Sequence, residues 1–424
     1  MEASATHPED RFLTEPAADV RAWAAAVLLS LSLALNFIAR LVLANVAPAL
    51  EAELHLSNTQ YSYIVFSFMT AMMLGQVPAG VMLDWIGARL GLPILLIGWS
   101  ASNILQSLAR GVLSFSGLRF LMGVFECGNQ SAAVKVIGGL FPARQTALAL
   151  AVMDSGSVIG SMVASPLVVF ILVHWGWRAA FSLPSLLGFL WLPLWFKFFR
   201  PGRSATLQHA AATEHPPGLR AIVRRRKVWG VVLMRAFAGP ISQFYWYWLP
   251  LYLVRGRGMS FQAMATLSFV AYLLGGLGSL FAGGFSNWLL KHGMSANAVR
   301  KLVFAVGTGF AASCAAVPLI PGIRIAIALI SLAIFGLNMT GTDLSAIIAD
   351  IFPEVTLARI SGLTGMGEGV MNMILTLTTG IVVDRVGFGP VFAGAGLMPL
   401  FSAAALFLVV GHIHRTSFAK PRYA

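Results

Sequence analysis

Long apolar runs separated by short polar loops dominate the sequence. A helix that crosses the hydrocarbon core of a membrane needs about 20 apolar residues, and twelve runs reach this length. They cover residues 22–48, 59–83, 90–109, 113–138, 145–173, 178–199, 228–254, 261–289, 300–320, 323–350, 357–383 and 389–411. The pattern therefore predicts an all-α integral membrane protein with twelve transmembrane helices.

One long polar segment, residues 200–227, divides the runs six and six. The two groups resemble one another, because the pairs Phe141-Pro142 and Phe352-Pro353 lie 211 residues apart, close to half of the 424-residue chain. The same offset relates Trp177 to Phe388. We therefore expect two six-helix bundles related by a pseudo-two-fold axis. In such duplicated carriers the substrate site lies between the halves, near the middle of the membrane.

The Lys and Arg residues predict the orientation of the chain, because cytoplasmic loops of membrane proteins are enriched in both. With the N-terminus placed inside, 19 of the 29 Lys and Arg are cytoplasmic, six lie in outer loops and four lie within runs. We expect the chain to span the inner membrane of the cell, with both of its termini in the cytoplasm. The predicted segments are a cytoplasmic tail (1–21), a first bundle (22–199), a cytoplasmic linker (200–227), a second bundle (228–411) and a cytoplasmic tail (412–424).

Composition narrows the class further. Hydrophobic residues make up 58% of the chain and charged residues 11%, whereas about 25% of a soluble globular chain is charged. Soluble, disordered and collagen-like chains are excluded. The net charge of +13 would indicate nucleic acid in a soluble protein, but the cytoplasmic loops account for it here. We expect membrane lipid and no nucleic acid as a partner.

The sequence gives no sign of a metal, a cofactor or a leader peptide. Cys127 and Cys314 both fall inside apolar runs, without the spacing of a zinc site or a disulfide framework. The first twenty residues are polar and contain five acidic residues, which a signal peptide does not. We expect the first run to remain in the mature protein as a helix.

A loop motif stands at the end of the second run. It reads Gly80-Val-Met-Leu-Asp84-Trp-Ile-Gly87-Ala-Arg89 and resembles the cytoplasmic-loop signature of the major facilitator superfamily. Trp85 replaces the basic residue that usually follows the Asp. The resemblance implies gating between conformations by Gly80, Asp84, Gly87 and Arg89, with Gly80 allowing close helix approach and Asp84 bonding a helix N-terminus. The alternative is that residues 80–89 form an ordinary polar loop without a gating role.

Charged side chains inside the runs are candidate functional groups, because they are costly in a membrane. In the fourth run, Arg119, Glu126 and Gln130 recur at helical spacing and are expected on one helix face. In the first run, Asn36 and Arg40 lie one turn apart. A guanidinium there offers a two-pronged donor that suits a carboxylate.

These residues belong to a longer resemblance. The segment Asn36-Phe-Ile-Ala39-Arg40 through Ala47-Pro48 resembles the anion:cation symporter family within the major facilitators, and its bacterial hexuronate and sugar-acid carriers in particular. The match continues through Arg235, Pro240 and Pro250 to Asp384-Arg385-Val-Gly387. It implies that Arg40, with Arg119 or Arg235, handles the anion and that Glu126 handles the proton.

The chain departs from that family at several acids. Ala39 stands where the family has an Asp beside the first-helix Arg, and Gly239 stands where an Asp is common. Asp154 and Glu368 are instead present in the fifth and eleventh runs, so we expect both to take part in proton coupling. For Asp154 the alternative is a structural pair with Lys135 or Arg144. The seventh run adds Tyr245 and Tyr247, which either line the binding site or join an interfacial aromatic belt.

The sequence thus predicts a secondary carrier that moves a small organic anion, a hexuronate, aldonate or similar carboxylate, by proton symport and alternating access. Other small anions (a sulfonate, a simple or an aromatic carboxylate) and an exchange or uniport mechanism remain open. No catalytic motif or metal-ligand spacing lies within the runs, which disfavours a membrane-embedded enzyme. A sensor would need an added cytoplasmic domain. We expect a monomer.

Overall fold

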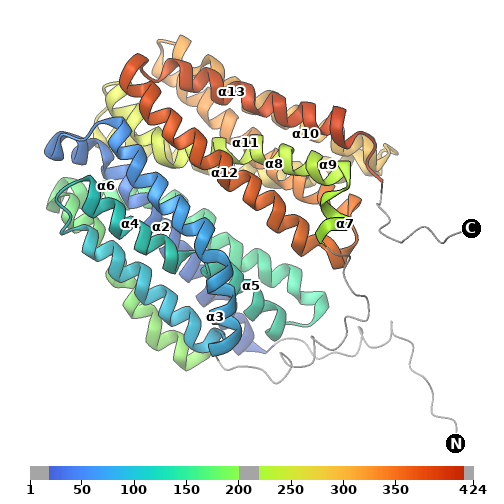
Figure 1. Cartoon of the computed structure of the whole chain (residues 1–424), viewed down its shortest axis with the longest axis horizontal. Helices are drawn as coiled ribbons and strands as arrows, with labels where there is room; N and C mark the ends of the chain where they lie inside the picture. Colours follow the sequence, from blue (N-terminus) through green and yellow to red (C-terminus); the bar gives the residue numbers. More distant parts are fainter. Residues whose placement is uncertain (1–18, 200–218, 415–424) are drawn as a thin grey trace, which may run out of the picture. The chain divides into compact units, whose positions relative to one another are not determined.

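The computed structural model describes residues 19–199 and 219–414. Every regular element in these two ranges is helical, and they contain no strand (Figure 1). This confirms the predicted all-α class. Most of the predicted tails 1–21 and 412–424 and of the linker 200–227 lies outside the described residues.

Five long helices cover the first six predicted runs. These are α2 (Val20–Leu54), α3 (Asn58–Gln106), α4 (Val112–Glu126), α5 (Asn129–Leu140) and α6 (Ala143–Phe198). The remaining elements are α7 (Leu219–Val223), α8 (Arg226–Leu251), η3 (Tyr252–Gly256), α9 (Phe261–Lys291), α10 (Ala296–Ala312), η4 (Ser313–Leu319), α11 (Ile323–Ile351), α12 (Glu354–Val386), α13 (Gly389–Ala404) and η5 (Ala405–Val410). Eight stretches in the described residues are long and apolar enough to cross a membrane by length and composition.

Two of the long helices each contain two predicted runs. α6 has 56 residues, which would extend about 84 Å at 1.5 Å per residue, far beyond a hydrocarbon core of about 30 Å. Gly176 interrupts it at φ 80°, and Gly87 interrupts α3 at φ 72°. Glycine reaches this left-handed region without steric cost. Each glycine therefore marks the turn between two successive crossings.

The fourth predicted run, 113–138, is not one continuous helix. α4 ends at Glu126 and α5 begins at Asn129, with a turn at Cys127 and Gly128. Asn129 is buried at the start of α5, where its side-chain oxygen accepts a hydrogen bond from Ser32 Oγ (3.1 Å). Cys127 and Gly128 both keep right-handed helical backbone angles, so Glu126 and Gln130 remain about one helical turn apart, and their common face stays a prediction.

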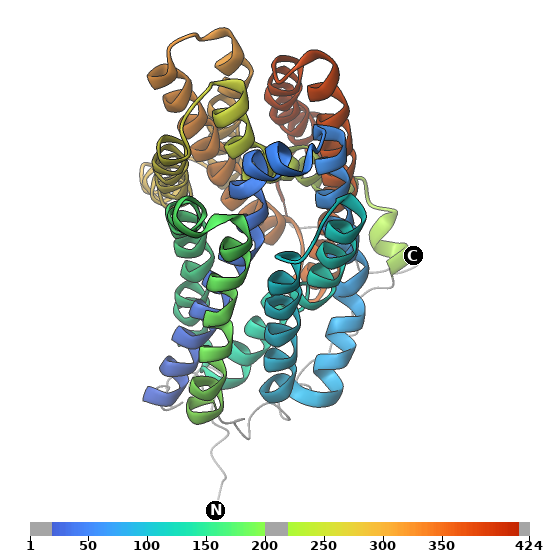
Figure 2. The ribbon, with the colours of Figure 1, turned by 90° about the vertical axis from the view of Figure 1, so that its left-hand side faces the viewer.

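The chain forms two compact units. Unit 1 comprises Met1–Val42 and Thr70–Thr213, and unit 2 comprises Leu43–Met69 and Glu214–Ala424. Helices within a unit lie side by side along a common direction (Figure 1 and Figure 2). Since the boundaries fall at 42/43 and 69/70, both α2 and α3 contribute one part to each unit.

Glycines let the helices of unit 1 approach closely. Gly156 and Gly160 of α6 lie one turn apart and face the backbone of α2 at Ser30 and Ala34, respectively. A Cβ at either glycine would overlap a main-chain carbonyl of α2. Small residues perform this role in membranes, where lipid is as apolar as the helices and close packing drives their association.

Replacing Gly156 with Ala should therefore destabilise unit 1, because neither backbone can yield to a new methyl group. We expect a cost of at least about 1–3 kcal/mol, the usual range for overpacking, and a lower melting temperature of the purified protein in detergent. Gly117→Ala in α4 is the matched control, since a Cβ there meets no atom within 4 Å. Equal melting temperatures for the two variants would contradict this account of the α2–α6 contact.

Candidate functional site

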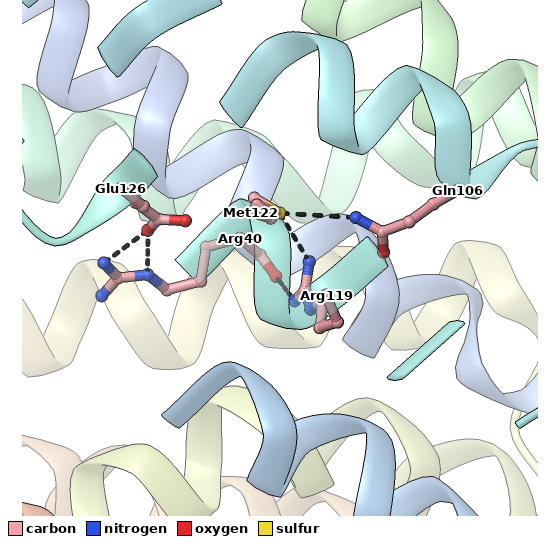
Figure 3. Close-up of polar contacts among 5 residues, drawn as sticks. All are labelled: Arg40, Gln106, Arg119, Met122 and Glu126. Atoms are coloured by element: carbon pink, nitrogen blue, oxygen red, sulfur yellow. Dashed lines mark hydrogen bonds and ion pairs between the residues drawn. The ribbon is translucent and has the colours of Figure 1, made fainter. Parts of the chain in front are cut away.

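A buried ion pair joins α2 to the end of α4 in unit 1. Both Nε and Nη2 of Arg40 lie close to Oε1 of Glu126, at 2.6 and 2.5 Å (Figure 3). The side chains are 11% and 0% exposed. Glu126 is the last residue of α4, where the negative end of the helix dipole disfavours a carboxylate. The Arg40 guanidinium supplies the compensating charge.

The Asn36 amide interacts with the Glu126 carboxylate. Its nitrogen, Nδ2, and the second carboxylate oxygen, Oε2, nevertheless form no well-aligned hydrogen bond within the described residues, and both are buried. Asn36 lies one helical turn before Arg40 on α2. Buried polar groups in folded proteins are normally satisfied by protein, water or ligand. These atoms therefore mark where a proton, a water or an anion oxygen would bind.

Arg119 supports the pair through the backbone. It is fully buried, and its Nη2 donates to the main-chain carbonyl of Arg40 at 2.6 Å. Its Nη1 contacts the Met122 sulfur at 3.2 Å, and Gln106 Nε2 reaches the same sulfur at 3.5 Å (Figure 3). Arg119 thus fixes the stretch of α2 that carries Arg40.

Gln130 and Asp154 form a second polar contact in unit 1. The Gln130 amide donates to Asp154 Oδ1 at 2.9 Å, which joins α5 to α6. The alternative partner that we considered for Asp154, Lys135, instead pairs with Asp84 at 2.5 Å. Sequence reasoning treated Asp84 and Lys135 separately, and no local spacing links residues so far apart.

The loop motif lies at the interruption of α3. Gly87 lies in the left-handed region, and the carbonyl of Arg89 accepts a hydrogen bond from Trp195 Nε1 at 3.2 Å. A Cβ at Gly80 would meet no atom within 4 Å. The expected close helix approach at Gly80 is therefore not seen in the part of the chain that the structure describes.

Unit 2 contains its own arginine–carboxylate pair. Arg235 of α8 donates from Nε to Oε2 of Glu368 on α12 at 2.6 Å. The two side chains are 39% and 21% exposed, so this pair is more open than Arg40–Glu126. The sequence analysis singled out both residues but did not predict their contact.

Tyr245 and Tyr247 lie in the packed interior of unit 2. Both are 1% exposed. The Tyr245 ring packs edge-on against Phe392 of α13, and its carbonyl accepts from the Tyr272 hydroxyl at 3.1 Å. The Tyr247 carbonyl accepts from the Tyr61 hydroxyl at 2.9 Å. A substrate-lining role for the two phenols stays a prediction.

Unit 2 also holds ionic contacts that sequence reasoning did not assemble. Arg300 bonds Asp350 (2.8 Å) and approaches Asp343 (3.5 Å) beside a cavity of about 250 Å³. Asp384 accepts hydrogen bonds from the backbone of Asn58 (2.9 Å) and Thr59 (2.8 Å) at the start of α3. A carboxylate is favourable at a helix N-terminus. The only signal in the sequence was the presence of these acids at or near the ends of runs.

The donor sets do not suggest a metal centre. No group of three or more His, Cys, Asp or Glu side chains within residues 19–199 and 219–414 is arranged to hold a metal ion. Cys127 and Cys314 are free and buried. The ionisable residues of the helices are arranged instead as guanidinium–carboxylate pairs.

Long apolar helices that hold charged side chains in ion pairs are the architecture of a helical membrane protein. The chain belongs to the Major Facilitator Superfamily, whose family model matches residues 29–343. Two similar proteins are hexuronate transporters. The one from Escherichia coli (strain K12) is 27% identical over 92% of this chain and 94% of its own length. The one from Bacillus subtilis (strain 168) is 31% identical over 89% and 92%.

The fold agrees with solved structures of the same class. A crystal structure of a D-xylose-proton symporter superposes with a TM-score of 0.76 and 15% identity, covering 92% of this chain and 98% of the other. These findings confirm three predictions from the sequence: the major facilitator family, its twelve-helix fold, and a transporter rather than an enzyme. They also establish the chain as a membrane protein.

Removing one member of the buried pair should destabilise unit 1. Arg40→Ala leaves the Glu126 carboxylate buried without its counter-ion, a change that costs about 3–5 kcal/mol in comparable proteins. The double variant Arg40→Met/Glu126→Met removes both charges and should recover most of the melting temperature. A single variant as stable as the wild type would show that the pair does not hold α2 against α4.

Proposed function

We propose that this protein is a secondary active transporter that moves a hexuronate or aldonate anion across the inner membrane together with a proton. Membership of the superfamily and the two hexuronate transporters among its relatives support the substrate class. The single observation that carries the proposal is the buried Arg40–Glu126 pair, with one oxygen of Glu126 unsatisfied.

Arg40 is the main anion anchor in this proposal. Its planar guanidinium can bind a carboxylate through two parallel hydrogen bonds, which a Lys cannot reproduce. Asn36, one turn away, has a buried amide nitrogen available to donate to a second substrate oxygen. Arg119 positions Arg40 from behind through its carbonyl. The substrate and Glu126 thus depend on the same guanidinium.

Glu126 carries the coupled proton. An ionised carboxylate is costly inside a membrane unless a positive charge compensates it. When a substrate carboxylate takes the Arg40 guanidinium, Glu126 loses the hydrogen bonds that compensate its charge, and a proton on Oε2 would neutralise it. A neutral Glu126 then costs less to carry through the change between inward-facing and outward-facing states that alternating access requires.

The remaining predicted residues have subsidiary roles in the proposal. Gln130 contributes to the substrate site with its partner Asp154, which shares in proton coupling. Arg235, Tyr245 and Tyr247 contribute from α8 to the substrate site, and Glu368 contributes from α12 to coupling. The gating residues are Gly80, Asp84, Gly87 and Arg89, with Lys135 holding Asp84.

The predicted orientation places both termini and the 200–227 linker in the cytoplasm, on the basis of the Lys and Arg distribution. We propose a multi-pass protein of the inner membrane that works as a monomer. Its two proposed bundles, residues 22–199 and 228–411, follow the duplication in the sequence; the compact units of the structure differ from them in assigning Leu43–Met69 to the second.

Uptake into proteoliposomes is the direct test of substrate and coupling ion. Radiolabelled D-glucuronate, D-galacturonate and D-galactonate should enter faster with an inward proton gradient than without one. Taurine and benzoate test the sulfonate and aromatic alternatives. Uptake of a sugar acid that ignores the proton gradient would leave the substrate class intact but replace symport by exchange or uniport. Absence of sugar-acid transport would overturn the proposal.

Glu126→Gln separates coupling from binding. The amide preserves size and hydrogen bonding but cannot change protonation, so net uptake should lose its response to the proton gradient. Exchange of internal for external D-glucuronate should survive, because no net proton movement is needed. Loss of exchange together with a lower melting temperature would instead identify Glu126 as a structural partner of Arg40.

A further inference from the structure

The carboxylate of Glu368 covers the backbone of Gly239. A Cβ built on Gly239 would lie 2.5 Å from both Cδ and Oε1 of Glu368, far inside van der Waals contact. The other oxygen, Oε2, accepts the hydrogen bond from Arg235. A side chain at position 239 and the present position of Glu368 therefore exclude one another.

The two contacts are one helical turn apart on α8. Arg235 and Gly239 have i, i+4 spacing and lie on the same face. Gly367, next to Glu368 on α12, contributes to the close approach, since a Cβ there would lie 2.9 Å from Val232 Cγ1 of α8. Glu368 is thus seated across one turn of α8, and glycines on both helices make room for it.

The Arg235–Glu368 pair is more exposed than the Arg40–Glu126 pair. Its side chains are 39% and 21% exposed, against 11% and 0%. Charged side chains within membrane helices almost always face the bundle interior or a water-filled cavity rather than lipid. The exposed part of the Arg235 side chain is therefore the surface at which an anion would meet this pair.

We propose that the Glu368 carboxylate competes with a substrate anion for the Arg235 guanidinium. Gly239, which has no side chain, leaves the space over α8 that this carboxylate occupies, its seat. This inference rests on the proposed function. In the absence of substrate, the Glu368 carboxylate occupies the guanidinium. A substrate carboxylate takes its place when Glu368 binds a proton, and the protonated side chain leaves the seat over Gly239.

Charge balance makes this exchange a coupling step. Arg235 and ionised Glu368 together are neutral, so a substrate anion would add a net negative charge to a site that is only partly solvated. One proton on Glu368 keeps the site neutral with the anion bound. Each anion that binds at Arg235 therefore brings one proton with it, and it leaves when that proton is lost.

Among the described residues, Arg235 is the one charged side chain that lies within hydrogen-bond distance of Glu368. α13, which packs on α12, carries no charged residue. The acids of α11, Asp343 and Asp350, pair with Arg300. The other charges of α8 and α12 lie near the ends of these helices; they are Arg226, Lys227, Glu354, Arg359, Asp384 and Arg385. Arg324 lies in the first turn of α11.

Equilibrium binding of radiolabelled D-glucuronate to the purified full-length chain tests the proposal. Wild type should bind more tightly at acidic than at alkaline pH. Glu368→Gln removes the competing charge, so at alkaline pH its dissociation constant should fall about tenfold, the smallest effect expected when a charge-assisted hydrogen bond no longer competes. The part of the pH dependence that Glu368 causes should disappear.

Gly239→Ala makes the same test without removing the acid. Its methyl group displaces the flexible Glu368 side chain from its seat, so binding at alkaline pH should tighten in the same direction. Combining it with Glu368→Gln should add little further. Gly365→Ala on α12 is the matched control, because a Cβ there meets no atom within 4 Å, and it should bind like wild type.

The outcomes separate this inference from the proposed function. Wild-type transport of D-glucuronate, with Glu368→Gln and Gly239→Ala both binding as wild type does, would overturn the competition and leave the transporter intact. Weaker binding by a stably folded Glu368→Gln would show that Glu368 assists the anion, which also contradicts competition. If Glu368→Gln does not fold, Gly239→Ala decides. A wild type that binds no sugar acid would contradict both.

Discussion

The cost of a charge inside a membrane shapes the arrangement of this protein. An ion removed from water loses several kcal/mol of solvation unless a partner and hydrogen bonds compensate it. Arg40 and Glu126 meet this condition by pairing across α2 and α4. Arg119 is buried in the same cluster, where the Glu126 carboxylate supplies opposite charge and the Arg40 carbonyl accepts a hydrogen bond from it. The close contact of α2 with α6 at Gly156 keeps the same helix in place.

The two guanidinium–carboxylate pairs differ in a way that suits different roles. Arg40–Glu126 is dry, and separating it leaves a buried charge without compensation, so its opening requires a proton or an anion. Arg235–Glu368 is partly exposed, where solvent screening lowers the cost of separation. An accessible pair can exchange its internal carboxylate for a solute more readily than a buried pair can. The buried pair can then respond to the protonation of a single oxygen.

The sequence predicted the helices well, because crossing a membrane demands length and apolarity that any run displays locally. It predicted the candidate residues from the cost of intramembrane charge, and it identified both members of Arg40–Glu126 and Arg235–Glu368. It did not predict contacts between distant segments. Asp154 accepts a hydrogen bond from Gln130, and Lys135, one of its two expected basic partners, pairs with Asp84. The side chain of the other, Arg144, lies outside the described residues. Such pairings arise from helix packing, which periodicity does not encode.

Ala39 and Gly239 both stand where the related family has an acid, but the structure explains the two positions differently. Resemblance to the anion:cation symporters implied that acids absent at these two positions were redistributed. At Gly239 the structure supports direct replacement, since the Glu368 carboxylate fills the space in which a side chain of residue 239 would begin. Ala39 is buried beside Arg40, and the acid that reaches Arg40 is Glu126, while Asp154 bonds Gln130. Under the proposed function, proton coupling at Arg40 rests on one carboxylate, and Glu368 is the acid that lies against a second guanidinium, that of Arg235.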